Sequence, residues 1–295
     1  MHVVLFHHAR IPPARYGGTE RVVAWLAAGL AELGHEVTLL AGKGSRVAGV
    51  HVVEVNAADV LSPRFDLKRF VASQVDLMHY HVPVKHPPKG VPWLWTLHGN
   101  MRNGTPPAQT ICLSADHARR HGVQAFVHNG LKLDEYEFRA TKDDFDLFLA
   151  RLHSVKGWQL AVQATRRCRV KLCVAGGWRP TFSRYLKFVG EVGGDEKRTL
   201  LAGAQCLWAP VQWDEPFGLN VIEAFASGTP VIGCPRGALP ELFVPSVGGL
   251  GQSLDDLVAL RRRIGEWKPE ECRAHAERRF SHIRMARDYV RMYEG

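Results

Sequence analysis

The sequence predicts an α/β protein made of two doubly wound domains, each built on a parallel sheet. Three observations support this prediction. The chain has 295 residues, a length natural for two domains of ordinary size. Its hydrophobic fraction of 46% and charged fraction of 23% are those of a globular protein. Strand-like apolar runs alternate with helical periodicity in both halves, which is typical of parallel sheets with crossover helices.

The first half opens with a strand, a helix and a second strand. Apolar residues run from His2 to His8, a Pro/Gly loop follows at Ile11–Gly18, and apolar positions then recur with a period near 3.6 from Thr19 to Leu33. Gly34 is placed to end that helix. Further strands are expected at Val37–Ala41, Val50–Val55, Val75–His81, Trp93–Leu97, Thr110–Leu113 and Ala125–Val127.

The second half repeats the alternation. Strands are expected at Phe145–Ala150, Val170–Ala175, Leu186–Val189, Cys206–Ala209 and Pro230–Gly233, and helices at Gly157–Arg167, Glu196–Ala202, Leu219–Ala226 and in the charged tail from Leu254. The polar segment Leu131–Asp144 separates the two halves. We therefore expect one domain at residues 1–138 and a second at residues 139–280.

Composition limits the classes of protein. No run approaches the roughly 18 apolar residues of a membrane span, and the N-terminal MHVVLFHHAR is too short and interrupted for a secretory signal, so we expect a cytoplasmic protein. The six cysteines form no C-x-x-C pair and are expected to be buried free thiols. The net charge of +9 favours polyanionic partners, such as nucleotide diphosphates or the anionic inner surface of a membrane. Nucleic acid is disfavoured because no basic run has interleaved aromatic residues.

Two carboxylates in DEPFGLNVIEAFASGTPVIG form the most informative motif. Glu215 and Glu223 are spaced E-x7-E across a Pro-Phe-Gly turn that leads into a helix. Phe217, Gly218 and Leu219 offer backbone N–H groups at the helix start, where an anion is favoured. Helix capping by acids would account for Glu215, but poorly for Glu223 inside an apolar stretch. The motif indicates a site for a sugar that carries phosphate.

Two cations flank the loop after the strand Phe145–Ala150. Arg151 and Lys156 have the spacing R-x4-K, which could clamp a diphosphate with a bidentate guanidinium and a point charge. Taken alone, an unrelated pair of surface cations is an equally good interpretation.

Two weaker signals lie in the first half. Tyr16-Gly17-Gly18-Thr19-Glu20 joins the first strand to its helix and would let a phosphate approach the backbone, although a tight turn without a ligand explains it as well. The segment is not G-x-G-x-x-G, which counts against a dinucleotide site. His98 in TLHGN follows a strand and could hydrogen-bond a substrate. His79 and His81 share one face of a strand, but nothing nearby completes a metal site.

Together these motifs resemble glycosyltransferase family 4, whose members have the GT-B fold of two facing Rossmann-like domains. The resemblance covers the whole chain, and the segments occur in the family's order: YGGTERVVAWLAAGLAELGHEVTLL, TLHGN, VHNGLKLDEYEF, FLARLHSVKG, GEVGGDEKRTLLAGAQCLWAP and EPFGLNVIEAFASGTPVIG. In this fold the last helix crosses back to the first domain, so residues 281–295 are expected to pack there.

The resemblance implies a retaining transfer of a sugar from a nucleotide donor to a hydroxyl acceptor, in glycan, glycolipid or small-molecule glycoside synthesis. Gly17 and Gly18 match the glycines beside the donor phosphates. Arg151 and Lys156 match the pair that stabilises the leaving diphosphate, a role that in other enzymes falls to a metal ion. The family usually needs no metal or other cofactor.

The remaining matches concern the donor sugar and the nucleoside. Glu223 matches the acid that binds the ribose hydroxyls, and His98 the histidine near the reacting sugar. Glu215 matches the group that holds the sugar, together with the backbone of Phe217, Gly218 and Leu219. The run GEVGGDEKRTLLA resembles short family members that use uridine diphosphate, so a UDP-sugar is favoured, with Gly190 and Val192 near the base.

The chain departs from the family pattern at three places. Ala150 stands where Gly commonly precedes the arginine, and Lys132 stands where Asp often occurs. The usual G-x-G reads Ala175-Gly176-Gly177-Trp178, which could alter the loop on the phosphate side, with Gly177 as its binding residue. Two other functions are disfavoured. One is a non-catalytic sugar-nucleotide-binding relative, which the intact charged residues disfavour. The other is a nicotinamide-dependent enzyme, which the missing G-x-G-x-x-G disfavours.

Overall fold

The chain divides into two compact units in the computed structural model, which describes residues 1–14 and 17–295. Unit 1 comprises Met1–Leu131 and Ser281–Gly295, and unit 2 comprises Lys132–Phe280. The division after Leu131 falls at the start of the polar segment, seven residues before the boundary expected from the sequence.

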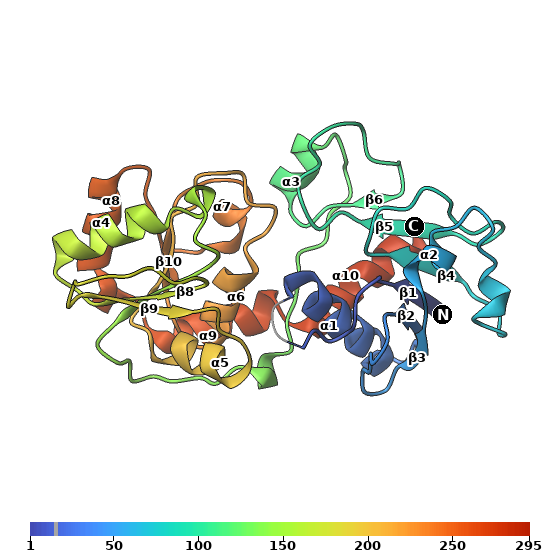
Figure 1. Ribbon diagram of the computed structural model, residues 1–295, viewed down its shortest axis with the longest axis horizontal. Coiled ribbons are helices and arrows are strands. Elements are labelled where there is room, and N and C mark those ends of the chain that lie inside the picture. Colours follow the sequence, from blue (N-terminus) through green and yellow to red (C-terminus); the bar gives the residue numbers. More distant parts are fainter. Residues whose placement is uncertain (15–16) are drawn as a thin grey trace. The chain divides into compact units, whose positions relative to one another are not determined.

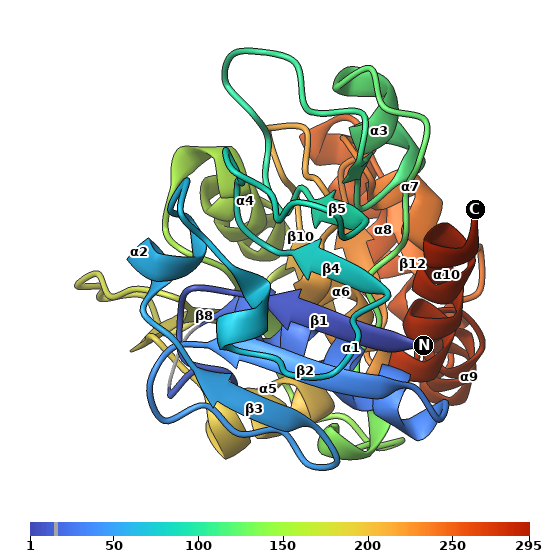
Figure 2. The ribbon, with the colours of Figure 1, turned by 90° about the vertical axis from the view of Figure 1, so that its right-hand side faces the viewer.

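Unit 1 is built on a six-stranded parallel sheet, which faces the viewer in Figure 2. Its strands are β1 (His2–Phe6), β2 (Glu36–Ala41), β3 (His51–Glu54), β4 (Leu77–Tyr80), β5 (Trp93–Thr96) and β6 (Thr110–Ile111). The spatial order is β3-β2-β1-β4-β5-β6, so the direction of winding reverses between β1 and β4. In open parallel sheets, ligands bind outside the carboxyl ends of the strands at such a switch point.

Helices cover the sheet of unit 1. They are α1 (Gly18–Glu32), α2 (Ala57–Val60), α3 (Ala115–Arg120) and α10 (His282–Glu294), with a short 3-10 helix at Leu67–Arg69. Helices α1 and α10 lie side by side (Figure 1), and a Cβ atom on Gly29 would lie only 2.9 Å from the carbonyl oxygen of His282. The backbone N–H of His282 also donates to the carbonyl of Leu131 at 2.9 Å. The C-terminal helix is therefore part of unit 1.

Unit 2 has a second six-stranded parallel sheet with the same winding. Its strands are β7 (Asp146–Leu149), β8 (Leu172–Ala175), β9 (Leu186–Gly190), β10 (Leu207–Ala209), β11 (Val231–Gly233) and β12 (Gly248–Leu250). They occur in the order β12-β11-β10-β7-β8-β9, which places the switch point between β7 and β10. Its helices are α4 (Trp158–Cys168), α5 (Gly194–Gly203), α6 (Leu219–Ala226), α7 (Leu239–Leu242), α8 (Leu254–Arg262) and α9 (Pro269–Arg279), with 3-10 turns at Leu133–Glu135, Ser154–Lys156 and Ile264–Glu266.

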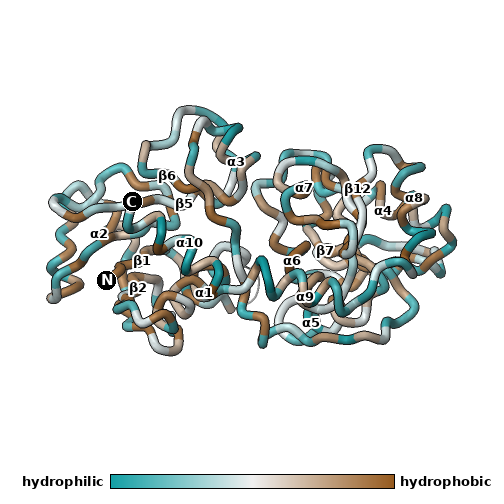
Figure 3. The backbone as a smooth tube through the Cα atoms, turned by 180° about the vertical axis from the view of Figure 1, so that it is seen from behind, coloured by the Kyte–Doolittle hydropathy of each residue, from teal (hydrophilic) through white to brown (hydrophobic). Residues whose placement is uncertain are grey.

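The two sheets form the cores of their units. Strand β1 and helix α6 are largely apolar, which gives them their brown colour in Figure 3, and most of their side chains are buried. The first residue of β7 carries a buried charge: Asp146 is fully buried and accepts from Arg261 Nε at 2.7 Å and from Trp208 Nε1 at 2.9 Å. Burial raises the pKa of Asp146, and the hydrogen bond from Arg261 opposes that rise. A paired buried charge of this kind fixes α8 against the sheet.

One expected strand is wrong. Ala125–Val127 forms only an isolated bridge, between Cys112 and Phe126, because the neighbouring β6 is two residues long and offers no ladder to extend. The sequence patterns also missed β12 and helices α2, α3 and α7, all too short to show a periodicity. The six cysteines are free thiols, and all but Cys168 are buried. None of the described helices is both long and apolar enough to cross a membrane.

Candidate active site

A pocket lies at the switch point of unit 2, outside the carboxyl ends of β7 and β10. It encloses about 290 Å³, including the part open to solvent. Its walls come from the ends of the two strands, from the loop before α4, and from the turn and first residues of α6. The lining residues are Phe148, Ala150, Lys156, Trp208, Ala209, Val211, Glu215, Gly218, Asn220, Val221 and Leu239. Two charged groups therefore share a mostly apolar pocket.

These two charged groups form an ion pair. Lys156 Nζ donates to Glu215 Oε2 at 2.6 Å, and the two side chains are 20% and 15% exposed. Trp213 holds both partners, because its Nε1–H donates to the same Glu215 oxygen at 2.7 Å and its ring lies 4.7 Å from Lys156 Nζ. A cation beside an acid, both largely shielded from solvent, can bind an anion and a hydroxyl next to each other.

The start of α6 forms one wall of the pocket. Gly218 adopts φ 104°, a left-handed conformation that favours glycine, and no side chain of the described residues caps the helix. Phe217 is buried, whereas Leu219 is partly exposed. Asn220 Nδ2 donates to the carbonyl of Leu149 at 3.0 Å and ties the helix to the end of β7. The N–H groups of this helix start are thus held at the carboxyl end of the sheet.

A glycine on a neighbouring loop fixes the position of Glu215. The backbone of Gly237 adopts φ 59°, and a Cβ atom there would collide with the backbone of Glu215. The next residue, Ala238, donates its N–H to the Glu215 carbonyl at 2.9 Å. Any side chain at Gly237 would therefore displace the acid from Lys156.

Glu223 lies further along α6 and is almost completely buried. Its Oε1 accepts from Tyr136 Oη at 2.7 Å and from Lys197 Nζ at 2.5 Å. Glu223 does not line the pocket that contains Glu215. The structure therefore gives the two acids of the E-x7-E motif different partners, and the sequence reasoning missed Tyr136 and Lys197, which are distant from Glu223 along the chain.

The other predicted residues of unit 2 lie around this edge of the sheet. Arg151 is exposed, and its side chain has no recorded hydrogen bond or ion pair within the described parts of the chain. Gly177 forms a bridge with Gly190, the last residue of β9, and the N–H of Gly177 donates to the Gly190 carbonyl at 3.3 Å. Val192 follows in the loop before α5 and is partly exposed.

The predicted residues of unit 1 follow its strands. Gly17 precedes α1 and Gly18 is its first residue, whereas Tyr16 of the same motif lies outside the described residues. His98 follows β5, and its Nε2 lies 2.9 Å from His81 Nδ1. Burial lowers the pKa of His98 to about 3, and neighbouring histidines contribute to the decrease. In residues 1–14 and 17–295, no group of three or more His, Cys, Asp or Glu side chains is arranged to hold a metal ion.

Two family models match the chain. Residues 16–132 match the model of Glycosyltransferase Family 4, and residues 146–266 match the model of Glycosyl transferases group 1. Among curated proteins, the chain is similar to a GDP-mannose-dependent alpha-mannosyltransferase of Corynebacterium glutamicum, with 26% identity over 206 residues, 63% of this chain and 48% of that protein. The chain spans about half the length, or less, of the curated relatives that it matches.

Solved structures show the same architecture. AviGT4, a glycosyltransferase involved in avilamycin A biosynthesis, has a TM-score of 0.82 and 28% identity, covering 99% of this chain and 97% of that one. HepE of Anabaena, in complex with UDP and glucose, has a TM-score of 0.68 and 16% identity, covering 99% of both chains. The latter likeness concerns the fold alone. The two matched models and the likeness to AviGT4 thus relate the chain to glycosyltransferases of the GT-B type, whose pair of Rossmann-like units it shares.

Proposed function

We propose that this protein transfers a sugar from a nucleoside-diphosphate donor to a hydroxyl acceptor, with retention of the anomeric configuration. The observation that carries the proposal is the pocket at the switch point of unit 2, where Lys156 and Glu215 form an ion pair beside the start of α6. A phosphorylated sugar needs both a cation and a hydrogen-bond acceptor within a few ångströms. The start of a helix adds N–H donors for phosphate oxygens.

The charged residues have separate roles in this proposal. Arg151, which is exposed and without a recorded partner in the described residues, binds the diphosphate together with Lys156. Glu215 accepts hydrogen bonds from the donor sugar, and Glu223 binds the ribose, exchanging its bonds with Tyr136 and Lys197 for bonds with hydroxyls. These two carboxylates hold the donor and are not an acid–base pair.

Chemistry in the proposed reaction takes place at the anomeric carbon. The bond from this carbon to the β-phosphate oxygen breaks, and the bonding electrons leave with the diphosphate. The acceptor oxygen bonds to the same face of the carbon, and its proton passes to the departing phosphate oxygen. Arg151 and Lys156 stabilise the charge that develops on the diphosphate, which is commonly a large catalytic contribution. No protein nucleophile and no metal ion take part in this scheme.

The donor is proposed to be a UDP-sugar, with Gly177, Gly190 and Val192 beside the nucleotide. Names of similar proteins point to more than one base, because the Corynebacterium relative is named for GDP-mannose and HepE was solved with UDP. The glycine pairing at the end of β9 favours close approach of a nucleotide to the backbone.

The acceptor is proposed to bind at the carboxyl edge of unit 1 and to carry an anionic group. Unit 1 has 16 lysines and arginines against 10 aspartates and glutamates. The loops after β1, β2, β4 and β5 contain no acid at all. Their exposed cations, none of them in a recorded ion pair within the described chain, are Arg10, Lys43, Arg46, Lys85, Lys89 and Arg102. Such a set attracts phosphate or carboxylate groups.

Donor turnover tests the reaction class. The protein is incubated with an α-linked UDP-sugar, with water or an added alcohol as the acceptor, and the products are followed by proton NMR. The proposal expects nucleoside diphosphate to appear and the first-formed sugar product to be the α anomer, in the presence of EDTA as in its absence. A β product would refute retention, and a loss of turnover in EDTA that Mn²⁺ restores would refute the metal-free scheme.

A further inference from the structure

Five histidines gather near the carboxyl edge of the unit 1 sheet. His7 follows β1, His79 and His81 lie in and just after β4, His98 follows β5, and His117 is in α3. The ring centroid of His81 lies 4.2 Å from that of His79 and 5.2 Å from that of His98. Among them only His98 has an expected role, because the family resemblance places it near the reacting sugar of the proposed transfer.

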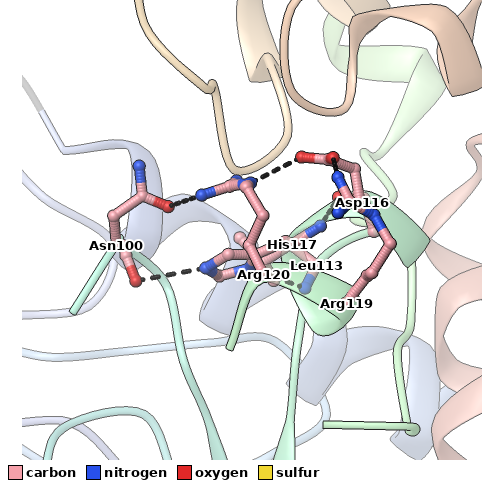
Figure 4. A network of polar contacts seen from close by, with 8 residues as sticks. Asn100, Leu113, Asp116, His117, Arg119 and Arg120 are labelled. Carbon is pink, nitrogen blue, oxygen red and sulfur yellow. Dashed lines mark hydrogen bonds and ion pairs between the residues drawn. The ribbon is translucent and has the colours of Figure 1, made fainter. Parts of the chain in front are cut away.

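The backbone beside His98 is attached to helix α3 (Figure 4). Burial lowers the pKa of His117 to about 4, so this ring is neutral near pH 7. Its Nδ1 accepts from the N–H of Leu113 at 3.3 Å, which leaves the proton on Nε2. That Nε2–H then donates to the carbonyl of Gly99 at 3.3 Å. Arg120 also donates to Asn100 Oδ1 at 2.9 Å, so the turn after His98 is held twice.

The ring of His98 has one recorded partner among the described residues, His81. The two nitrogens, His81 Nδ1 and His98 Nε2, lie 2.9 Å apart, so one of them donates a proton to the other. The second nitrogen of His81, Nε2, is buried and has no hydrogen-bond partner in the described structure. Burial holds the pKa of His81 well below its usual range, so His81 carries a single ring proton.

Two arrangements of protons are compatible with this geometry. If His98 donates, His81 must carry its own proton on Nε2, and a buried N–H is left without an acceptor. If His81 donates from Nδ1, its Nε2 is only an unpaired acceptor. Buried N–H groups without partners are rarer than buried acceptors without partners, because they lose their full hydrogen bond to water. The second arrangement is therefore favoured, and it places the proton of neutral His98 on Nδ1.

We propose that His81 is a positioning residue, which fixes the ring of His98 and its tautomer so that His98 presents an Nδ1–H donor to the substrate. The Nδ1 of His98 has no recorded partner in the described residues, and the side chain is partly exposed. His98 would then donate a hydrogen bond to a sugar hydroxyl or phosphate oxygen, and it would not act as a base through Nδ1. The inference that His98 binds substrate rests on the proposed function, whereas the inference about its tautomer rests only on the hydrogen bond with His81.

Hydrogen bonds of the neighbouring His79 keep the ring of His81 in place. His79 bonds through both ring nitrogens, to Tyr293 Oη at 2.8 Å and to Thr96 Oγ1 at 2.7 Å, and Thr96 Oγ1 lies 2.9 Å from Tyr289 Oη. The rings of His79 and His81 are therefore packed against a fixed set of hydrogen bonds from α10. No proton donor for His81 Nε2 is recorded within this set of described side chains.

Histidine NMR tests the tautomer directly. Two-bond ¹H–¹⁵N spectra of the full-length protein, labelled with ¹⁵N-histidine, distinguish Nδ1–H from Nε2–H rings, and the His98→Ala variant identifies the signals of His98. The proposal expects His98 to be neutral with its proton on Nδ1, from pH 7.5 down to pH 5.5. An Nε2–H tautomer in the wild-type spectrum would overturn it, whatever the activity of the enzyme.

Two variants of His81 separate its hydrogen bond from its bulk. Asn places an amide N–H close to the position of the histidine Nδ1–H, whereas Phe fills the space without a donor. We expect His81→Phe to change the tautomer signature of His98 and to lower kcat/KM about tenfold, the value of one hydrogen bond. His81→Asn should retain the signature and most of the rate. Equal losses in both variants, with the signature unchanged, would refute the positioning role.

The two failures are distinguishable. If the wild-type tautomer is as expected but His98→Ala retains full turnover, the assignment of His98 to the substrate fails and the inference about His81 stands. If turnover falls in His98→Ala but the ring carries its proton on Nε2, the inference about His81 fails.

Discussion

The ion pair of Lys156 and Glu215 makes the role of the cation measurable. In the proposed reaction Lys156 stabilises the departing diphosphate, so Lys156→Ala should slow turnover more than it weakens donor binding. A unit charge about 4 Å from a phosphate oxygen contributes about 4 kcal/mol at an effective dielectric constant of about 20. Water entering the variant would recover up to about half of this. The expected loss of about 2–4 kcal/mol corresponds to a fall in kcat of about 30- to 1,000-fold.

The variant should still fold. Glu215 is 15% exposed and keeps its hydrogen bond from Trp213 Nε1 at 2.7 Å. Losing one hydrogen bond to a charged group costs about 1.5–3 kcal/mol, which a domain of ordinary stability tolerates. Circular dichroism and a thermal melt establish folding before the kinetics are compared.

The assay is the initial rate of nucleoside diphosphate release at saturating donor, together with the donor Kd. Lys171→Ala is the matched control, because Lys171 is also a lysine of unit 2 in an ion pair, with Asp144 at 2.9 Å, but is 58% exposed and does not line the pocket. The control should keep the wild-type rate. A wild-type kcat in Lys156→Ala, or an equal loss in the control, would refute the reasoning.

Four further predictions concern other parts of the molecule. Glu223→Ala should raise the donor Kd, measured by isothermal titration, about 10- to 100-fold, the value of one hydrogen bond to a charged group. An unchanged Kd would remove Glu223 from the ribose site. Arg261→Ala leaves the buried Asp146 carboxylate without its cation and should lower the free energy of unfolding by about 3–5 kcal/mol in urea, whereas the exposed control Arg263→Ala should cost less than about 1 kcal/mol. Burial lowers the pKa of His79 to about 3, so below pH 6.5 the unfolded chain binds a proton that the folded chain excludes. The contribution of His79 to the free energy of unfolding should therefore be complete above that pH and should fall by about 2 kcal/mol between pH 7 and pH 5. The free energy of unfolding of the His79→Asn variant should fall less between these two pH values than that of the wild type. An equal fall in the two proteins would refute this contribution of His79. Replacing Lys85, Lys89 and Arg102 together by Gln should weaken the binding of an anionic acceptor and make this binding less dependent on salt concentration. The control, in which Arg64, Lys68 and Arg69 are replaced by Gln, should bind the acceptor as the wild type does. Equal salt dependence in the two variants would refute an acceptor site at these loops.

Most of the fold could be predicted from the sequence, because it depends on patterns among residues that are close along the chain. Alternating strands and helices with short connections leave few topologies, and right-handed crossovers select parallel sheets. This reasoning missed β12 and the helices α2, α3 and α7, which have three to six residues, because neither a strand pattern nor a period of 3.6 can be recognised over so few positions. Ala125–Val127 is the clearest case: its composition suits a strand, but pairing requires a partner ladder that β6 does not supply.

The charged site was predictable only in part. The spacing of Arg151 and Lys156 and the E-x7-E motif identified residues near the switch point of unit 2, because loops at the carboxyl ends of strands are local in sequence. No local pattern indicates that Lys156 pairs with Glu215, 59 residues away, or that Glu223 pairs with Tyr136, 87 residues before it. Such contacts depend on how the sheet is wound.

The histidines show the same limit. His79 and His81 were recognised as lying on one face of a strand, but the hydrogen bond between His81 and His98 joins residues after two different strands. The register of β4 and β5 brings these strand ends together. A sequence pattern confined to one strand cannot reveal it.

Donor binding tests the central claim most directly. Thermal melting of the wild-type protein is measured with UDP-glucose, GDP-mannose and ADP-glucose, each well above its expected Kd, and repeated with Glu223→Ala. A ligand at about 100 times its Kd stabilises the folded state by about 2.7 kcal/mol, enough to raise the melting temperature by several degrees. We predict such a rise with a UDP-sugar and a much smaller rise in the variant. No rise with any of the three sugar nucleotides would contradict the account.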